Sequence, residues 1–247
     1  MTYCLGIKLQ QGLVFCTDSR TNAGVDQVAS YSKLHRFENF SDRKFFILTA
    51  GNLATTQAVI KTIRTDLETG AAFNMLTAQS TTEVADYVGR LSTQIQQKYA
   101  SGGGASAGFD AGATFIVGGQ IMGRESEIYM VYSEGNHIGA AKKHPFLQIG
   151  ETKYGKPILE RIIQPDTSPN TAMLCALVSM DSTIHSNATV GPPVELLYYQ
   201  NDCFLAESEY HLFDDGDARF ASLSKAWNEK ICSAFSELPP LGDPSYQ

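Results

Sequence analysis

The residue with the clearest potential for chemistry is Thr2, which directly follows Met1. A threonine hydroxyl is a weak nucleophile until a base removes its proton. Removal of Met1 would give Thr2 a free α-amine, whose reference pKa of about 7.7–8.0 suits a base at neutral pH. The start of the chain therefore predicts an N-terminal nucleophile, in which one threonine carries both the attacking oxygen and the base. Chains that begin Met-Thr are common, so the prediction depends on what accompanies Thr2.

An acid is expected close to this threonine. Two short β-rich runs, 3–7 and 13–17, are separated by the turn candidate Gln10-Gln11-Gly12, a pattern that predicts a hairpin. If Gln10 and Gln11 form a two-residue loop, the residue numbers of each cross-strand pair sum to 21. Asp18 then lies opposite residue 3 and beside Thr2. The alternative interpretation is an ordinary turn aspartate.

A lysine and a glycine follow on the next two predicted strands. Lys33 falls within the strand candidate 31–37, and the strand candidate 43–50 ends at Gly51, directly before a helical pattern. An ammonium near Thr2 would favour an alkoxide-like oxygen and lower the pKa of the α-amine. The N–H of a glycine at a helix N-terminus has the correct sign to bind a tetrahedral oxyanion. A surface lysine and a linker glycine are the alternative.

These residues carry a family resemblance. Thr2, the run Asp18-Ser19-Arg20, Lys33 and the segment Thr49-Ala50-Gly51 occur in the order and nearly at the spacing of the proteasome β-subunit and HslV peptidase family. The chain resembles this family over about residues 2–205, and most closely its bacterial branch called Anbu. The resemblance implies an αββα sandwich of two stacked antiparallel sheets flanked by helices, and a threonine-type endopeptidase.

The resemblance also implies roles for single residues. Thr2 would be the nucleophile, Asp18 would orient and pair with Lys33, and Gly51 would supply the oxyanion N–H. The pocket for the substrate residue before the cleaved bond would be lined by Tyr31, Thr49 and Leu53. The candidates for a proton relay are Ser19, Glu151 and Asn187.

Two of these relay candidates depart from the family pattern. Glu151 occupies the place of the usual glycine-flanked serine. Asn187 stands where proteasome subunits tend to carry aspartate, although HslV-type chains have asparagine. The sequence leaves open how these two departures affect the proton network.

The wider pattern of elements agrees with this fold class. The order is strands, two helices, strands, two helices, strands and a last helix, which fits two stacked sheets with helices outside. Helices are predicted over 53–67, with Asn52 as N-cap and Gly70 at the end, over 84–95, before Pro165, after Ser168-Pro169 and from about Asp217. Later strands are predicted over 113–117, 127–132, 146–149, 194–199 and 203–206.

Length and composition favour one compact domain over residues 1–247, with a C-terminal helical extension at about 217–237. The chain has 247 residues, of which 43% are hydrophobic, and a formal net charge of −7. Without a long basic cluster this charge disfavours nucleic-acid binding. The five cysteines are scattered and odd in number, which argues against a disulfide framework or a zinc site. We expect no cofactor and no metal.

Three further observations concern location and competing motifs. No apolar run approaches the roughly 18 residues of a membrane helix, and Met1-Thr2-Tyr3-Cys4 lacks a basic signal-peptide segment, so a cytoplasmic protein is expected. Gly104–Gly108 matches a nucleophile elbow around Ser106, but a helix precedes it and a strand follows, the reverse of what that motif requires. Asp214–Asp217 is interpreted as acidic helix capping in preference to a metal loop.

Three functions remain open on the sequence. They are a threonine peptidase acting on peptides or unfolded chains, an N-terminal nucleophile amidase for small non-peptide amides, and an inactive assembly subunit of the same fold. Self-association into a ring or an open spiral is expected. The sequence is also compatible with binding of a regulator, which it does not identify. The apolar stripe of the last helix, from Phe220 through Trp227 to Phe235, either forms an interface or folds back on the subunit.

Overall fold

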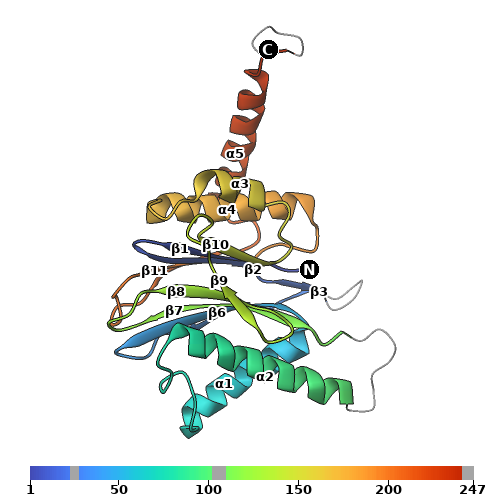
Figure 1. Ribbon diagram of the computed structural model, residues 1–247. Helices are drawn as coiled ribbons and strands as arrows, with labels where there is room; N and C mark the ends of the chain where they lie inside the picture. The colour runs from blue at the N-terminus through green and yellow to red at the C-terminus, as the bar shows by residue number, and fades with distance from the viewer. Residues whose placement is uncertain (23–27, 102–109, 241–247) are drawn as a thin grey trace.

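The computed structural model of the protein describes residues 1–22, 28–101 and 110–240. In this part of the chain, two five-stranded antiparallel sheets lie face to face. Helices α1 (Leu53–Thr69) and α2 (Thr81–Ser101) cover the outer face of one sheet, and α3 (Lys156–Ile162) and α4 (Pro169–Ser186) cover the other (Figure 1). These four layers confirm the predicted αββα sandwich.

The first sheet has the strand order β10-β1-β2-β11-β12, and the second has the order β5-β6-β7-β8-β9. Strands β3 and β4 form a separate two-stranded pair. The bounds are β1 Tyr3–Leu9, β2 Gly12–Asp18, β3 Arg20–Asn22, β4 Val28–Ser30, β5 Leu34–Phe37, β6 Arg43–Gly51, β7 Ala113–Ile121, β8 Glu127–Val131, β9 His137–Gly139, β10 Phe146–Gly150, β11 Val194–Gln200 and β12 Glu209–Phe213.

Side chains alternate between two apolar layers along each central strand, because successive residues of a strand point to opposite faces. In β1 and β2, Leu5 and Cys16 pack toward α3 and α4, whereas Cys4 and Phe15 pack between the sheets. A third layer, which includes Phe115, lies between the second sheet and the helices α1 and α2. Burial on both faces explains why these strands read as continuous apolar runs.

The helix boundaries follow the predicted caps. The Asn52 side chain accepts a hydrogen bond from the N–H of Thr55, and Gly70 ends α1 in the left-handed conformation at φ 64°. Ser168 accepts from the N–H of Thr171 at the start of α4. Asp217 caps the last helix, α5 (Ala218–Ser236), which supports the capping interpretation of the acidic segment before it.

Two predicted strands differ from the structure. Residues 203–206 do not form a strand, because Asp202, at φ 62°, turns the chain directly after β11 and leaves Leu205 89% exposed. The pairing partner of β11 on that side is β12, further along the chain. The strand expected over 31–37 is shortened to β5, and residues 31–33 lie outside regular structure. Ser106 lies outside the described residues.

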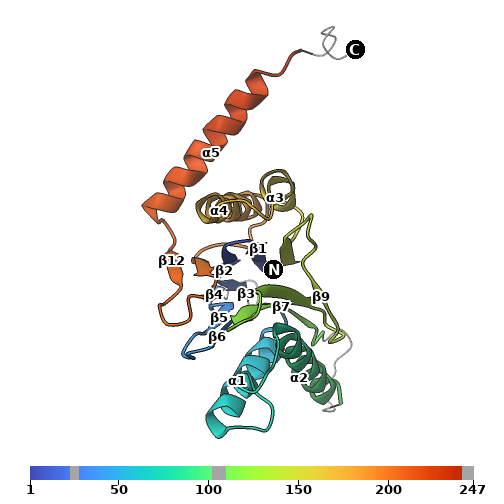
Figure 2. The same ribbon diagram turned by 60° about the vertical axis from the view of Figure 1, so that its left-hand side comes forward.

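Helix α5 projects away from the sandwich (Figure 2). Phe220 packs against Phe213 at its base, with ring centroids 5.9 Å apart, but no residue of the helix is buried. Ile231 and Phe235, on the predicted apolar stripe, are 47% and 75% exposed. The stripe therefore does not fold back fully onto the subunit.

Candidate active site

Asp18 is the last residue of β2 and lies beside the start of β1. Cys4 pairs with Thr17 and Leu9 with Gly12 across the hairpin, which confirms the predicted register. The main-chain N–H of Tyr3 donates to Asp18 Oδ1 over 3.0 Å. The carboxylate is therefore held next to the residue that follows Thr2.

Lys33 reaches the same carboxylate from the segment between β4 and β5. Its Nζ donates to Asp18 Oδ1 over 2.7 Å and to the carbonyl oxygen of Arg20 over 2.8 Å. The N–H of Gly191 donates to Asp18 Oδ2 over 3.3 Å. Asp18 is completely buried and Lys33 is 6% exposed, so this ion pair is largely shielded from water.

Burial and charge oppose each other at this site. Complete burial raises the pKa of the Asp18 carboxyl, whereas the Lys33 ammonium and the N–H groups of Tyr3 and Gly191 act in the opposite direction. Burial, followed by the Lys33 charge, lowers the pKa of the α-amine, which Met1 carries here. Burial raises the pKa of the Cys4 thiol to about 12, so this neighbour of the site stays a neutral thiol.

A cavity of about 370 Å³ opens beside Thr2 and Lys33. It lies at the point where the ends of β1, β6 and β10 come together. Its walls contain two of the three predicted pocket residues, Thr49 and Leu53. Tyr31 is not among the lining residues; it is 44% exposed, and its N–H donates to the carbonyl oxygen of Ser19. The lining residues are Met1, Thr2, Arg20, Thr21, Lys33, Thr49, Ala50, Gly51, Leu53, Thr56 and Gly150.

Two glycines allow the backbone to approach this cavity closely. Gly51 ends β6 at φ 101°, and a Cβ there would lie 2.5 Å from the carbonyl oxygen of Gly112. Gly150 ends β10 at φ 81°, and a Cβ there would lie 1.9 Å from the carbonyl oxygen of Thr2. Both positions require glycine because of the left-handed conformation and because of the space. Gly150 was not singled out by the sequence analysis.

Glu151 and Asn187 meet next to Thr2. The N–H of Glu151 donates to the carbonyl oxygen of Thr2 over 2.7 Å, and Glu151 Oε2 accepts a hydrogen bond from Asn187 Nδ2 over 3.1 Å. Asn187 Oδ1 in turn accepts from the N–H of Thr189 over 3.0 Å. Two of the three relay candidates thus form one hydrogen-bonded group beside the proposed nucleophile.

The third relay candidate, Ser19, faces a different residue. Its hydroxyl donates to Glu195 Oε1 over 2.8 Å. Glu195 lies in β11, is 5% exposed and was missed by the sequence analysis. The feature of the sequence that could have identified Glu195 is its position as a single carboxylate inside the apolar run 194–199. A carboxylate buried in a strand needs specific hydrogen-bond partners.

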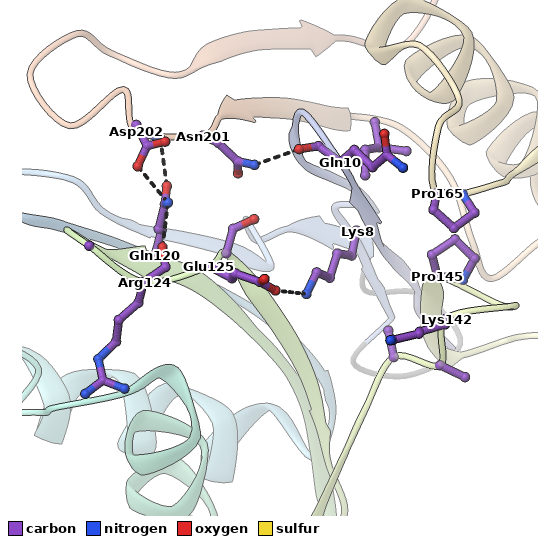
Figure 3. A pocket seen from close by; sticks show the side chains of 15 residues that line it. Lys8, Gln10, Gln120, Arg124, Glu125, Lys142, Pro145, Pro165, Asn201 and Asp202 are labelled. Atoms are coloured by element: carbon purple, nitrogen blue, oxygen red, sulfur yellow. Dashed lines mark hydrogen bonds and ion pairs between the residues drawn. The ribbon is translucent and has the colours of Figure 1, made fainter.

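A second cavity, of about 720 Å³, lies at the opposite end of the β1–β2 hairpin (Figure 3). Gln10 lines this cavity. Because a strand rises about 3.3 Å per residue, Gln10 lies roughly 25 Å from Thr2 along the extended chain. Lys8 pairs with Glu125 at 3.7 Å, and Gln120 Nε2 donates to Asp202 Oδ1 over 2.9 Å (Figure 3). These contacts join its walls to one another and bring none of the predicted site residues together.

The described ranges contain no group of three or more histidine, cysteine, aspartate or glutamate side chains arranged to hold a metal ion. Within the same ranges, no helix is long and apolar enough to cross a membrane.

Two sheets between helical layers, with Thr2 directly before the first strand and close to a buried Asp–Lys pair, define the proteasome type of the N-terminal nucleophile hydrolase fold. A family profile described as "Proteasome subunit" matches residues 2–198. The chain therefore belongs to the proteasome subunit family. No significant match was found among curated proteins.

Within that family the chain is similar to solved structures of Anbu proteins. Anbu (ancestral beta-subunit) from Yersinia bercovieri is 37% identical, with a TM-score of 0.89 over 97% of this chain and 98% of that one. The helical assembly of the Anbu complex from Pseudomonas aeruginosa is 37% identical, with a TM-score of 0.90 over 99% and 100%. An Anbu mutant from Hyphomicrobium sp. strain MC1 is 38% identical, with a TM-score of 0.88 over 98% and 99%.

Proposed function

We propose that the protein is a threonine-type endopeptidase that becomes active when Met1 is removed. The observation that carries the proposal is the buried ion pair of Asp18 and Lys33, held against the residue that follows Thr2. A buried charged pair costs free energy in desolvation, and a functional site is one context in which such a pair is retained. The cavity at Thr2 supplies space for a substrate side chain.

In the proposed reaction, Thr2 Oγ attacks the carbonyl carbon of a peptide bond. Its proton passes to the α-amine of the same residue, directly or through a water, and then to the leaving amine as the C–N bond breaks. Water hydrolyses the resulting ester and restores the hydroxyl. Lys33 favours the negative oxygen by Coulomb attraction and lowers the pKa of the amine, so that more of the amine is a free base at pH 7.

Other residues of the cavity have proposed roles around this step. The N–H of Gly51 binds the tetrahedral oxyanion, and loss of such a donor costs about 3–4 kcal/mol of transition-state stabilisation. Thr49 and Leu53 contact the substrate residue before the cleaved bond. Glu151 and Asn187 form the proton-relay group, since their hydrogen bond adjoins the carbonyl of Thr2.

Self-association into a ring or an open spiral belongs to the same proposal. The Anbu relative from Pseudomonas aeruginosa forms a helical assembly, and the exposed stripe of α5 offers apolar surface for a subunit contact. Walls shared between subunits would restrict access to Thr2, so that peptides and unfolded chains are the proposed substrates.

Mass spectrometry of the native N-terminus, combined with hydrolysis of short peptide amides, tests the proposal. We expect a chain that starts at Thr2 and cleaves internal peptide amides. A trimmed chain that cleaves only small non-peptide amides would favour the amidase. An untrimmed chain without activity would favour an inactive assembly subunit.

A further inference from the structure

Glu195 is a buried carboxylate outside the catalytic set. It lies in β11 opposite Thr17 of β2 and opposite Leu212 of β12, and only 5% of its surface is exposed. Burial of a carboxylate is costly unless hydrogen bonds replace its water. A carboxyl group inside an otherwise apolar strand therefore needs hydrogen-bond partners.

Three hydroxyl groups surround this carboxylate. Oε1 accepts from Ser19 Oγ over 2.8 Å, and Oε2 accepts from Ser32 Oγ over 3.0 Å and from the hydroxyl of Tyr210 over 2.9 Å. None of the ion pairs found in the described part of the chain includes Glu195. The Ser32 hydroxyl also lies 3.0 Å from the carbonyl oxygen of Leu34, so its single proton is shared between that carbonyl and Oε2.

The two serines are the direct sequence neighbours of the ion pair. Ser19 follows Asp18, and Ser32 precedes Lys33. A second link runs parallel to the first, because the N–H of Tyr31 donates to the carbonyl oxygen of Ser19 over 3.0 Å. One carboxylate therefore connects the backbone segments that carry the acid and the lysine.

The segment that carries Lys33 has little support from regular structure, although the N–H of Thr49 donates to the carbonyl oxygen of Lys33 over 3.1 Å. Residues 31–33 lie outside the strands, and the preceding β3 and β4 form a two-stranded pair separate from both large sheets. Isolated two-stranded pairs are marginally stable. Glu195 and Asp18, in contrast, both lie within the first sheet, where Asp18 of β2 pairs with Val194 of β11.

We propose that Glu195 is a positioning residue, which holds Ser32 to Ser19 and the first sheet and thereby sets the separation and direction of the Asp18–Lys33 pair. This inference rests on the proposed function, in which that pair acts on Thr2. It gives the Ser19 hydroxyl a supporting role at the ion pair.

The test compares Glu195→Ala with Glu195→Gln in hydrolysis of a peptide amide. Alanine removes both acceptor oxygens, and we expect kcat to fall about 10- to 100-fold, since small displacements of catalytic groups have effects of that size. KM should change by less than about twofold, because Glu195 does not line the cavity. Glutamine keeps the shape and an acceptor oxygen, so it should restore kcat to within about threefold of the original.

Glu127→Ala is the matched control. Glu127 lies in β8 of the other sheet and accepts a hydrogen bond from the hydroxyl of Tyr129 over 3.1 Å. Its removal should leave kcat unchanged. A glutamine variant as impaired as the alanine variant, or an alanine variant with kcat within twofold of the original, would overturn the proposal.

Ser32→Ala provides a second variant if Glu195→Ala does not fold. Ser32 is exposed, so we expect Ser32→Ala to lower kcat less than Glu195→Ala does. Combining Ser32→Ala with Glu195→Gln should not lower kcat further than Ser32→Ala alone. Crystal structures separate failure of this inference from failure of the proposed function. If the original protein cleaves no peptide, the positioning role still requires the 2.7 Å distance from Lys33 Nζ to Asp18 Oδ1 to lengthen in Ser32→Ala or Glu195→Ala. An unchanged distance would reject it.

Discussion

The ammonium of Lys33 lies 2.7 Å from the carboxylate of Asp18, and water has almost no access to either group. Substitution of either partner lowers stability strongly, because the remaining buried charge is left without compensation. Lys44 and Glu38 form another ion pair at 3.2 Å, in which Lys44 is buried and Glu38 is partly buried, and this pair lies away from the cavity at Thr2. The two pairs allow effects on stability to be separated from effects on catalysis.

We expect Lys33→Ala and Asp18→Asn to lower kcat much more than they change KM, because the proposed role of the pair is realised mainly in the transition state. Lys33→Ala should also reduce the free energy of unfolding by about 3–5 kcal/mol. Peptide hydrolysis and urea unfolding measure the two effects. Lys44→Ala is the control and should lose stability without losing turnover. Turnover near the original value in Asp18→Asn would exclude the assigned role of Asp18.

Thr2→Ala should abolish hydrolysis while leaving fold and assembly intact. Alanine keeps the carbonyl oxygen that accepts a hydrogen bond from Glu151, so the strand geometry is retained. Activity is measured on short peptide amides, with Thr62→Ala as the control, since the Thr62 hydroxyl donates to the carbonyl oxygen of Ala58 in its own helix. Residual activity above about one part in a hundred would contradict a threonine nucleophile.

Gly150→Ala should displace Thr2, because the new Cβ would overlap the carbonyl oxygen and carbon of Thr2 at 1.9 and 2.7 Å. We expect a loss of activity of about 100-fold or more, since displacement of a nucleophile by about 1 Å has such an effect. Gly70→Ala is the matched control. It has a similar φ of 64°, but no atom lies within 4 Å of its added Cβ. Equal activity in both alanine variants would refute the steric argument.

His35 should make the free energy of unfolding depend on pH. Burial, followed by the charge of Arg64, lowers the pKa of His35 to about 4. Between about pH 6.5 and pH 4 the unfolded chain therefore binds a proton that the folded chain does not, and stability is lost as the pH falls. Between pH 7 and pH 4.5 this group should account for about 2 kcal/mol. Urea unfolding of His35→Gln at both values should show a drop smaller by that amount; an identical drop would exclude His35 as the cause.

Light scattering should give a mass well above the 26.9 kDa of one chain, because exposed apolar surface on α5 favours subunit contacts. Ile231→Asp combined with Phe235→Asp should reduce that mass or raise the concentration needed for association. Lys225→Gln, an exposed change on the same helix, is the control. A monomeric original protein would refute self-association, and an unchanged mass in the double variant would assign the contact to another face.

The hairpin and the helix caps were predictable from the sequence because their geometry is local. A two-residue loop and strict alternation determine that Asp18 lies opposite Tyr3, and the structure has this register. Asn52 and Gly70 bound α1 through hydrogen bonds to backbone groups a few residues away. Cys203 to Ala206, in contrast, resemble a strand in composition, but the turn at Asp202 decides against it.

The sequence by itself determined the αββα layers, the candidate nucleophile and the acid beside it, because periodicity and short loops encode which elements form and how neighbours pair. Only the tertiary structure decided that Glu151 meets Asn187 and that Glu195 meets Ser19, residues 36 and 176 positions apart. Such contacts depend on how the layers stack and on where strand ends converge. No local pattern of residues carries that information, because each side chain is placed by packing between elements that are distant along the chain.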